Sequence, residues 1–290
     1  MNEIILYHRS DLDGHCSGAI AKIAHPTAEL HGIEYGDEIP WDKINEARVI
    51  MVDFSLQPWS EMERLNKDAA EVIWIDHHRS AINEYRSRDP WKTDGKIVLE
   101  EGKAACELAW EHFFPDVPMP RLVHLLGRYD VWDLDADPQV LALQMGMRLK
   151  NLNPSQEEAM DWWSRELSAP DQSELVTCIA NDGNIVSMYQ KQCNERLMSK
   201  AFELDWRGFR WLAVNAGGIN SQACESKFDK EKHDGFMSFF WTGKLWTVSL
   251  YAPAQNQDFS GIAKDMGGGG HPAACGFQLE TIAEIITNIT

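Results

Sequence analysis

Three short apolar runs near the N-terminus have the length and composition of buried β-strands. They cover Glu3–Tyr7, Arg48–Asp53 and Glu71–Asp76. Each is an almost unbroken apolar series, without the alternation that is typical of a strand with one face in water. Each run also ends at a polar residue. We therefore expect a sheet that is covered on both faces, with polar side chains along one edge.

Helical segments separate and follow these runs. Gly14–Ala24 and Pro58–Ala69 lie between the strand candidates, and Lys103–Phe113 and Arg121–Tyr129 continue the helical pattern. A proline fits the first turn of a helix, where its missing N–H costs nothing. Alternation of strand and helix implies a parallel sheet with helices on its faces. The predicted fold class is therefore α/β.

The pattern changes in the middle of the chain. The stretch from Leu149 to about Pro170 mixes Asn, Pro, Ser and acidic residues with Trp162-Trp163, and we interpret it as the edge of a first domain. Glu174 to about Phe202 can form one long helix, which Asp182-Gly183-Asn184 could bend. We predict a domain over residues 1–165, a helical linker over 166–204 and a second domain over 205–290.

From about Asp205 the strand and helix signals restart on a smaller scale. The strand candidates are Phe209–Asn215, Phe236–Trp241, Leu245–Tyr251 and Ala273–Leu279. The helix candidates are Phe259–Met266 and Thr281–Ile289. We expect a smaller α/β domain, joined to the first by the helical linker.

Composition narrows the class of protein. The chain has 290 residues, of which 44% are hydrophobic and 25% charged, as in a soluble protein of two domains. No apolar run reaches the roughly 18 residues of a membrane span, and the first residues lack the basic start of a signal peptide. The six cysteines form no C-x-x-C pair, which favours reduced thiols and a cytoplasmic location.

The net charge of −18 argues against a general binder of long duplex DNA, which usually needs a basic surface. It does not exclude a small anionic ligand. Two divalent cations would offset about four negative charges locally, so that a phosphate could bind through metal despite an acidic exterior.

The candidate chemistry lies where the predicted strands and one helix end. His8–Gly14 follows the first strand, Asp53 ends the second, Asp76-His77-His78 ends the third, and Asp130 follows a helix. In open α/β sheets, ligands bind beyond the carboxyl ends of the strands. We therefore expect these side chains to converge. Carboxylates combined with imidazole suit manganese, magnesium or iron.

Each cluster also has a purely structural interpretation. Asp11-Leu12-Asp13-Gly14 alone is typical of a calcium-type turn or a capped helix start, and Asp53 alone would cap the next helix. Asp133 competes with Asp130 for any role at that position. Asp76-His77-His78 could be a helix cap followed by two solvent-facing histidines. Their shared position at strand ends favours the metal site.

A distant glycine run suggests an anion site. The run Gly267-Gly268-Gly269-Gly270 precedes His271-Pro272, and its plain alternative is a flexible loop. Glycines let backbone N–H groups approach an anion closely, and His271 would add a side-chain donor. The substrate-binding candidates are Gly268, Gly269, Gly270, His271 and, beside Asp130, Arg128.

Together these motifs resemble the DHH phosphoesterase superfamily, in the branch that carries a DHHA1 domain. The matching stretches are Asp11-Leu12-Asp13-Gly14, Asp53, Asp76-His77-His78 and Asp130, followed by the DHHA1 signature at Gly267–Phe277. They occur in the family's order along nearly the whole chain. The most similar type is the oligoribonuclease B-like, or nano-RNase, branch.

The resemblance implies a role for each residue. One cation would be held by His8, Asp11 and Asp53, and a second by Asp13, Asp53, His77 and Asp130, with Asp53 bridging. Asp76 would orient ligands from behind. His78 would contact the scissile phosphate, and His271 with the glycine run would bind the substrate. The expected cofactors are two divalent cations, with manganese favoured and magnesium as the alternative.

The expected activity is hydrolysis of short single-stranded oligonucleotides, including dinucleotides, to mononucleotides. The alternatives are hydrolysis of cyclic mono- or dinucleotides, and removal of the 3′-phosphate from 3′-phosphoadenosine-5′-phosphate. From another class, a nucleotide-binding sensor without turnover stays open. No membrane partner is expected, and a homodimer is one candidate for the oligomeric state.

Overall fold

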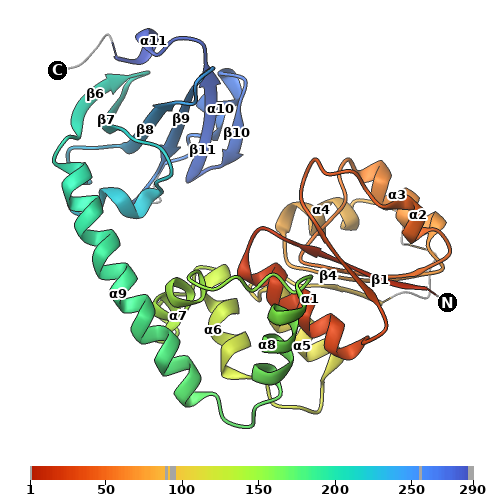
Figure 1. The fold of residues 1–290 in the computed structure, drawn as a ribbon. Coiled ribbons are helices and arrows are strands. Elements are labelled where there is room, and N and C mark those ends of the chain that lie inside the picture. The colour runs from red at the N-terminus through yellow and green to blue at the C-terminus, as the bar shows by residue number, and fades with distance from the viewer. Residues whose placement is uncertain (1, 89–90, 92–95, 255–256, 287–290) are drawn as a thin grey trace. The chain divides into compact units, whose positions relative to one another are not determined.

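The computed structural model describes residues 2–88, 91, 96–254 and 257–286. The chain forms two compact units, Met1–Ser187 and Met188–Thr290, with the border inside helix α9 (Ser173–Met198) (Figure 1). Among the described residues, no helix has the length and apolar character that a membrane crossing requires.

The first unit is built on a five-stranded parallel sheet in the order β2-β1-β3-β4-β5. The strands are β1 (Glu3–His8), β2 (Glu29–Ile33), β3 (Arg48–Val52), β4 (Glu71–Asp76) and β5 (Lys96–Leu99). The helices are α1 (Leu12–Ala24), α2 (Trp41–Ile44), α3 (Trp59–Asp68), α4 (Arg79–Arg86), α5 (Ala105–Phe113), α6 (Arg121–Asp130), α7 (Val140–Met147) and α8 (Glu157–Leu167), before α9.

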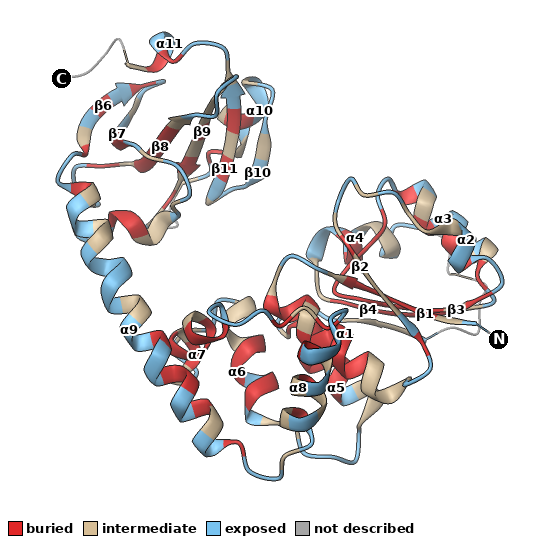
Figure 2. Cartoon of the chain, in the orientation of Figure 1, coloured by how far each residue is buried: buried red, intermediate tan, exposed pale blue. Residues whose placement is uncertain are grey.

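The central strands are apolar throughout because helices cover both sheet faces. Ile5 and Tyr7 of β1 face a core formed with α1 and the helices from α5 to α8. Ile4 and Leu6 face a second core formed with α2 and α3. The buried positions follow each other without a break along the central strands (Figure 2). The predicted α/β fold with a parallel sheet and flanking helices is confirmed.

The stretch that we interpreted as a domain edge is instead part of the first core. Helix α8 runs through it, and the side chain of Trp163 is fully buried, with its indole N–H donating to the Leu152 carbonyl at 2.8 Å. The polar residues that suggested an edge lie on the exposed face of the helix, whereas Ala159 and Leu167 are buried.

At Asp182-Gly183-Asn184, where the sequence allowed a bend, α9 continues as a helix. A Cβ atom on Gly183 would overlap the carbonyl oxygen of Ala142 in α7. The glycine therefore allows two helices to pack closely and does not break the helix.

The second unit contains a six-stranded mixed sheet in the order β10-β11-β9-β8-β7-β6. Only the β7–β8 pair is parallel among these described strands. The elements are β6 (Phe202–Trp206), β7 (Phe209–Asn215), the 3₁₀ helix η1 (Ser221–Cys224), β8 (Gly235–Trp241), β9 (Trp246–Tyr251), α10 (Ser260–Asp265), β10 (Gly269–His271), β11 (Ala274–Leu279) and α11 (Ala283–Ile286). The end of the predicted helix Thr281–Ile289 lies outside the described residues.

Candidate metal centre

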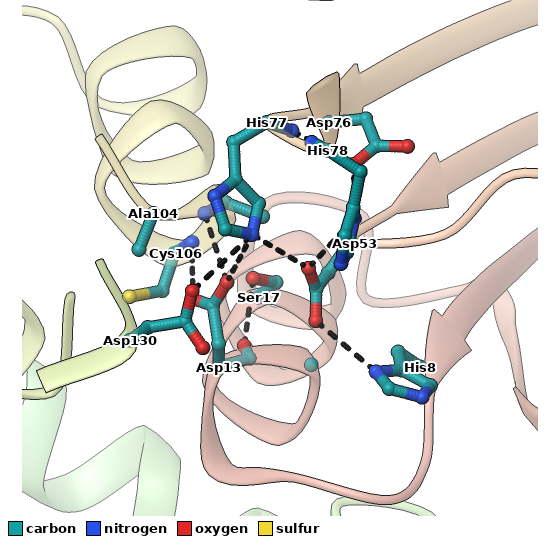
Figure 3. A network of polar contacts seen from close by, with 12 residues as sticks. His8, Asp13, Ser17, Asp53, Asp76, His77, His78, Ala104, Cys106 and Asp130 are labelled. Atoms are coloured by element: carbon teal, nitrogen blue, oxygen red, sulfur yellow. Dashed lines mark hydrogen bonds and ion pairs between the residues drawn. The ribbon is translucent and has the colours of Figure 1, made fainter. Parts of the chain in front are cut away.

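The polar ends of three adjacent strands meet at one edge of the parallel sheet (Figure 3). Tyr7 pairs with Val52, and Val52 pairs with Ile75, so the residues that follow these positions lie beside one another. Those residues are His8, Asp53 and Asp76. The convergence expected from the sequence follows directly from this register.

The loop from β1 into α1 places a first group of ligands. The Nδ1 atom of His8 lies 2.7 Å from Oδ2 of Asp11 and 3.5 Å from Oδ2 of Asp53. Asp11 also caps α1, since its Oδ1 accepts the N–H of Gly14 at 2.8 Å. The helix-cap interpretation and the metal-site interpretation are therefore compatible, because they use different oxygens of one carboxylate.

Gly14 makes this close approach possible. A Cβ atom at position 14 would overlap the carbonyl oxygen of His8. The glycine therefore lets the first turn of α1 begin directly against the end of β1.

Asp13 is held from behind by the N-terminus of α5. Its two carboxylate oxygens accept the backbone N–H groups of Ala105 at 2.9 Å and Cys106 at 2.8 Å. Such amides, together with the helix dipole, favour a negative charge at this position. The side chain is almost fully buried, so its orientation is set by backbone that lies far away in the sequence.

His77 collects a second group of ligands. Its Nε2 atom lies 3.3 Å from Oδ2 of Asp130, 3.4 Å from Oδ1 of Asp53 and 3.7 Å from Oδ2 of Asp13. Asp130 is the last residue of α6, whereas Asp133 faces Arg128 at 3.5 Å. The structure thus brings Asp130 to the site.

Asp53 lies between the two groups. One of its oxygens faces His8 and the other faces His77. It is 2% exposed, and its φ angle of 55° is in the left-handed region, which Asp adopts more readily than most side chains. The turn after β3 therefore directs this carboxylate into the middle of the cluster.

Asp76 lies behind the two histidines and contacts them instead of the other carboxylates. Its Oδ1 atom accepts the backbone N–H of His77 at 2.7 Å and of His78 at 3.1 Å, and it lies 2.7 Å from Nδ1 of His78. The carboxylate therefore fixes the turn that presents both histidines. With Nδ1 directed at Asp76, His78 keeps Nε2 for another partner, and its side chain is 39% exposed.

Burial and mutual charge shift the protonation of the cluster. Burial opposes a charge on His8 and His77, but the surrounding carboxylates raise the pKa of His8 to about 11 and of His77 to about 10. Burial and the charge of Asp53 raise the pKa of Asp13 to about 7. Burial and the charge of Asp13 raise the pKa of Asp130 to about 7. In the absence of a cation, protonated histidines thus offset the negative charge of the carboxylates.

The donor set fits divalent cations. Three groups have ligand atoms within 4.8 Å of one another: His8, Asp11 and Asp53; Asp13, His77 and Asp130; and Asp53, His77 and His78. Within the described chain, Oδ1 of Asp53 is buried without a hydrogen-bond partner. Buried polar atoms in this state are costly unless another ligand satisfies them. Oxygen and imidazole donors suit manganese or magnesium.

Arg128 is engaged by protein groups. Its guanidinium contacts the buried carboxylate of Glu107, and it lies 3.3 Å from the carbonyl oxygen of Gly102. Glu107 in turn accepts the N–H of Ala104 at 3.1 Å, at the start of the helix that holds Asp13. These contacts join α6 to α5, and the substrate-binding role of Arg128 stays a prediction.

Glu34 belongs to the site but escaped the sequence motifs. It directly follows β2, and its Oε2 atom lies 3.4 Å from Nε2 of His8 and also contacts the hydroxyl of Ser10. Carboxylates in this position hold the imidazole of a metal-binding histidine in orientation. The signal was weak because Glu29–Ile33 lacks an apolar run, so the strand that ends before Glu34 was missed.

In the second unit, the glycine run forms an exposed hairpin at the sheet edge. Gly269–His271 is strand β10 and pairs with β11. Gly267 and Gly270 have φ angles of 78° and 130°, which require glycine or nearly so. Gly267–Gly270 line an open depression of about 550 Å³ with Ser249 and Gln278. His271 is exposed beside it, and the binding roles of Gly268, Gly269, Gly270 and His271 stay predictions.

A family comparison agrees with these motifs. Residues 3–124 match the DHH family, N-terminal domain. Uncharacterized protein R106 of Acanthamoeba polyphaga mimivirus is 26% identical over 97% of this chain and 68% of its own length.

Solved structures resemble this chain at low sequence identity. The pGpG-specific phosphodiesterase PggH from Vibrio cholerae has a TM-score of 0.55 at 13% identity, covering 98% of this chain and 95% of that one. RecJ from Thermus thermophilus in complex with Mn²⁺ has a TM-score of 0.48 at 16% identity, covering 97% of this chain and 50% of that one. At such identity the likeness to PggH shows the fold alone.

Proposed function

Residues 3–124 form a DHH-family N-terminal domain, and from that premise we propose that this protein is a two-metal phosphodiesterase that hydrolyses short oligonucleotides to mononucleotides. As a member of that family, the chain is a metal-dependent hydrolase of phosphoester bonds. The observation that supports the finer proposal is the position of Asp53, whose two oxygens face two separate groups of ligands.

Two neighbouring groups of carboxylate and imidazole ligands support the proposal of two cations. His8, Asp11 and Asp53 would hold one, and Asp13, Asp53, His77 and Asp130 the other. Bound divalent cations would lower the pKa of a water ligand and neutralise charge on a phosphate. Manganese is the proposed metal, because carboxylate and imidazole donors are mixed here.

His78 is suited to assist at the phosphate. Its contact with Asp76 raises its pKa, so the imidazole favours the protonated form. With Nδ1 turned to Asp76, the Nε2 proton can be donated to a phosphate oxygen or to the leaving oxygen. A general acid of this kind typically contributes about 10²- to 10⁴-fold in rate.

A substrate panel in Mn²⁺ tests the proposal. We expect purified protein to convert a labelled dinucleotide to mononucleotides, and the His77→Ala variant to be inactive. Longer RNA and DNA, pGpG, cyclic dinucleotides and 3′-phosphoadenosine-5′-phosphate complete the panel. Turnover of cyclic dinucleotides or of 3′-phosphoadenosine-5′-phosphate, without cleavage of linear dinucleotides, would show that the protein is a phosphoesterase with a different substrate. Turnover of no substrate beyond the level of the variant would favour the nucleotide sensor.

A further inference from the structure

An exposed aromatic ring stands directly beside the metal centre. The described residues include four exposed large aromatic side chains: Tyr35, Trp132, Tyr189 and Trp241. Of these, Tyr35 is the one whose ring packs with a histidine of the metal site, at 6.2 Å between the ring centroids of His8 and Tyr35. Tyr35 follows Glu34, so one short segment after β2 contacts the metal centre through both residues.

The ring of Tyr35 is supported on one side and open on another. It packs on Phe54 with centroids 4.6 Å apart and an interplanar angle of 33°. Phe54 is buried and directly follows Asp53, so the support is part of the rigid turn that carries the bridging carboxylate. Tyr35 itself is 48% exposed. An aromatic ring that is fixed by such packing and remains half exposed can stack with another flat group.

The surroundings of this ring select the kind of ligand. The acidic side chains of Asp53, Asp76 and Glu34 lie close enough to the phenol of Tyr35 to act on it electrostatically. These acidic surroundings disfavour an anion at the ring unless metal holds that anion. A neutral flat group that is covalently attached to a metal-bound phosphate satisfies both conditions.

We propose that Tyr35, supported by Phe54, forms a stacking subsite for a nucleobase of the substrate. The inference rests on the proposed phosphodiesterase function and adds a recognition element to it. A nucleotide carries its base one sugar away from its phosphate. The Tyr35 ring likewise lies beside the metal centre, with its centroid 6.2 Å from that of His8. Stacking on a single aromatic ring is sequence-tolerant, because every base has a π-face. The subsite therefore selects for the presence of a base and not for its identity.

Substrates that lack one base test the subsite. The wild type, Tyr35→Ala and Tyr35→Phe would be compared in Mn²⁺ on a dinucleotide and on two analogues, abasic at the 5′ or the 3′ nucleotide. We expect Tyr35→Ala to lower kcat/KM on the intact dinucleotide about 10-fold, mainly through KM, while Tyr35→Phe retains it. On the analogue that lacks the base bound by Tyr35, the wild type and Tyr35→Ala should have the same low kcat/KM, because the stacking partner is already absent.

The controls separate this idea from its alternatives. Titration calorimetry should give the same Mn²⁺ affinity for Tyr35→Ala and the wild type, which excludes damage to the metal site. An equal loss on all three substrates, or no loss on any, would overturn the subsite. If the wild type cleaves no diester at all, the proposed function fails first. Tyr35→Leu keeps apolar packing on Phe54, so a loss there as well assigns the effect to the flat ring.

Discussion

The carboxyl edge of the first sheet and the glycine hairpin of the second unit are built in opposite ways. At the sheet edge, acids such as Asp13 and Asp53 are buried and face histidines. At the hairpin, His271 is exposed, and the glycine run lines an open depression together with Ser249 and Gln278. The first region concentrates buried carboxylates, whose negative charge a cation would neutralise. The second is an open surface on which a ligand would bind.

From this difference we propose separate tasks for the two regions. A buried cluster of acids with raised pKa values is poised for metal-dependent chemistry. An open depression lined by glycines together with Ser249 and Gln278 lets a ligand approach the backbone closely. Substitutions at the sheet edge should therefore act on turnover and metal binding, and substitutions at the hairpin on substrate affinity.

The largest effect is expected at Asp53. Asp53→Asn should lower turnover of a dinucleotide in Mn²⁺ by more than about 10³-fold, because the carboxylate shared by both ligand groups is lost. The variant should remain folded by circular dichroism, since Asn also adopts a left-handed backbone and removes a buried charge. Asp133→Asn is the matched control and should retain activity. Equal loss in both variants would contradict the assignment.

A smaller effect is expected at Glu34. Glu34→Gln should weaken Mn²⁺ binding about 10- to 100-fold at one of the two sites, because the support of the His8 imidazole is reduced. Titration calorimetry would measure this. Glu38→Gln changes an acid in the same segment that makes no contact with His8 among the described ion pairs, and it should leave Mn²⁺ affinity unchanged. An unaltered affinity in Glu34→Gln would show that His8 needs no such support.

At the hairpin, His271→Ala should raise KM for the dinucleotide about 10-fold through loss of a charge-assisted hydrogen bond. Mn²⁺ affinity and the melting temperature should stay those of the wild type. Steady-state kinetics with calorimetry would test this. Weakened Mn²⁺ binding in this variant would break the separation between the two regions.

The smallest effect is a pH dependence of stability, measurable in degrees of melting temperature. The folded pKa values of His8 and His77 exceed the ordinary 6.5, so their contribution is complete below about pH 6.5 and is lost as pH rises towards about 10 to 11. Raised pKa values of Asp13 and Asp130 cost stability as pH rises from about 4 through about 7. The metal-free protein should therefore melt lower at high pH.

A cation should reverse this trend. Mn²⁺ displaces protons from the histidines, so its affinity rises with pH, and so does the stabilisation that it provides. Scanning fluorimetry in EDTA and in Mn²⁺, from about pH 6 to about pH 9, would measure both. A melting-temperature shift on Mn²⁺ addition that does not depend on pH would show that the histidines are not ligands.

The strands that carry the metal centre could be predicted because each is a continuous apolar run in the sequence, as expected of a buried strand. Strands β1, β3 and β4 lie in the middle of a sheet covered on both sides, so nearly every position is apolar. The edge strands β2 and β5 were missed, because Glu29–Ile33 mixes polar with apolar residues and the apolar run of Lys96–Leu99 is only three residues long.

The site could be predicted only as far as the chain keeps ligands near strand ends. His8, Asp53 and His77 are of that kind. The amides of α5 that hold Asp13 come from more than ninety positions away, as the separations of 92 and 93 residues show. Periodicity carries no information about such contacts. The glycine run was expected as an anion site, with a flexible loop as the alternative, and its pairing with β11, which makes Gly269–His271 a strand, was not foreseen.

The clamp on Asp13 has a consequence for the rate of metal uptake. Two backbone N–H groups of α5 donate to this carboxylate. Separately, Asp76 accepts the backbone N–H groups of His77 and His78. The chain therefore completes the ligand arrangement when it folds, before any ion arrives. Ion capture then consists of shedding water and protons and needs little movement of the backbone. Mn²⁺ should enter in one fast kinetic phase, with no slow conformational step after it.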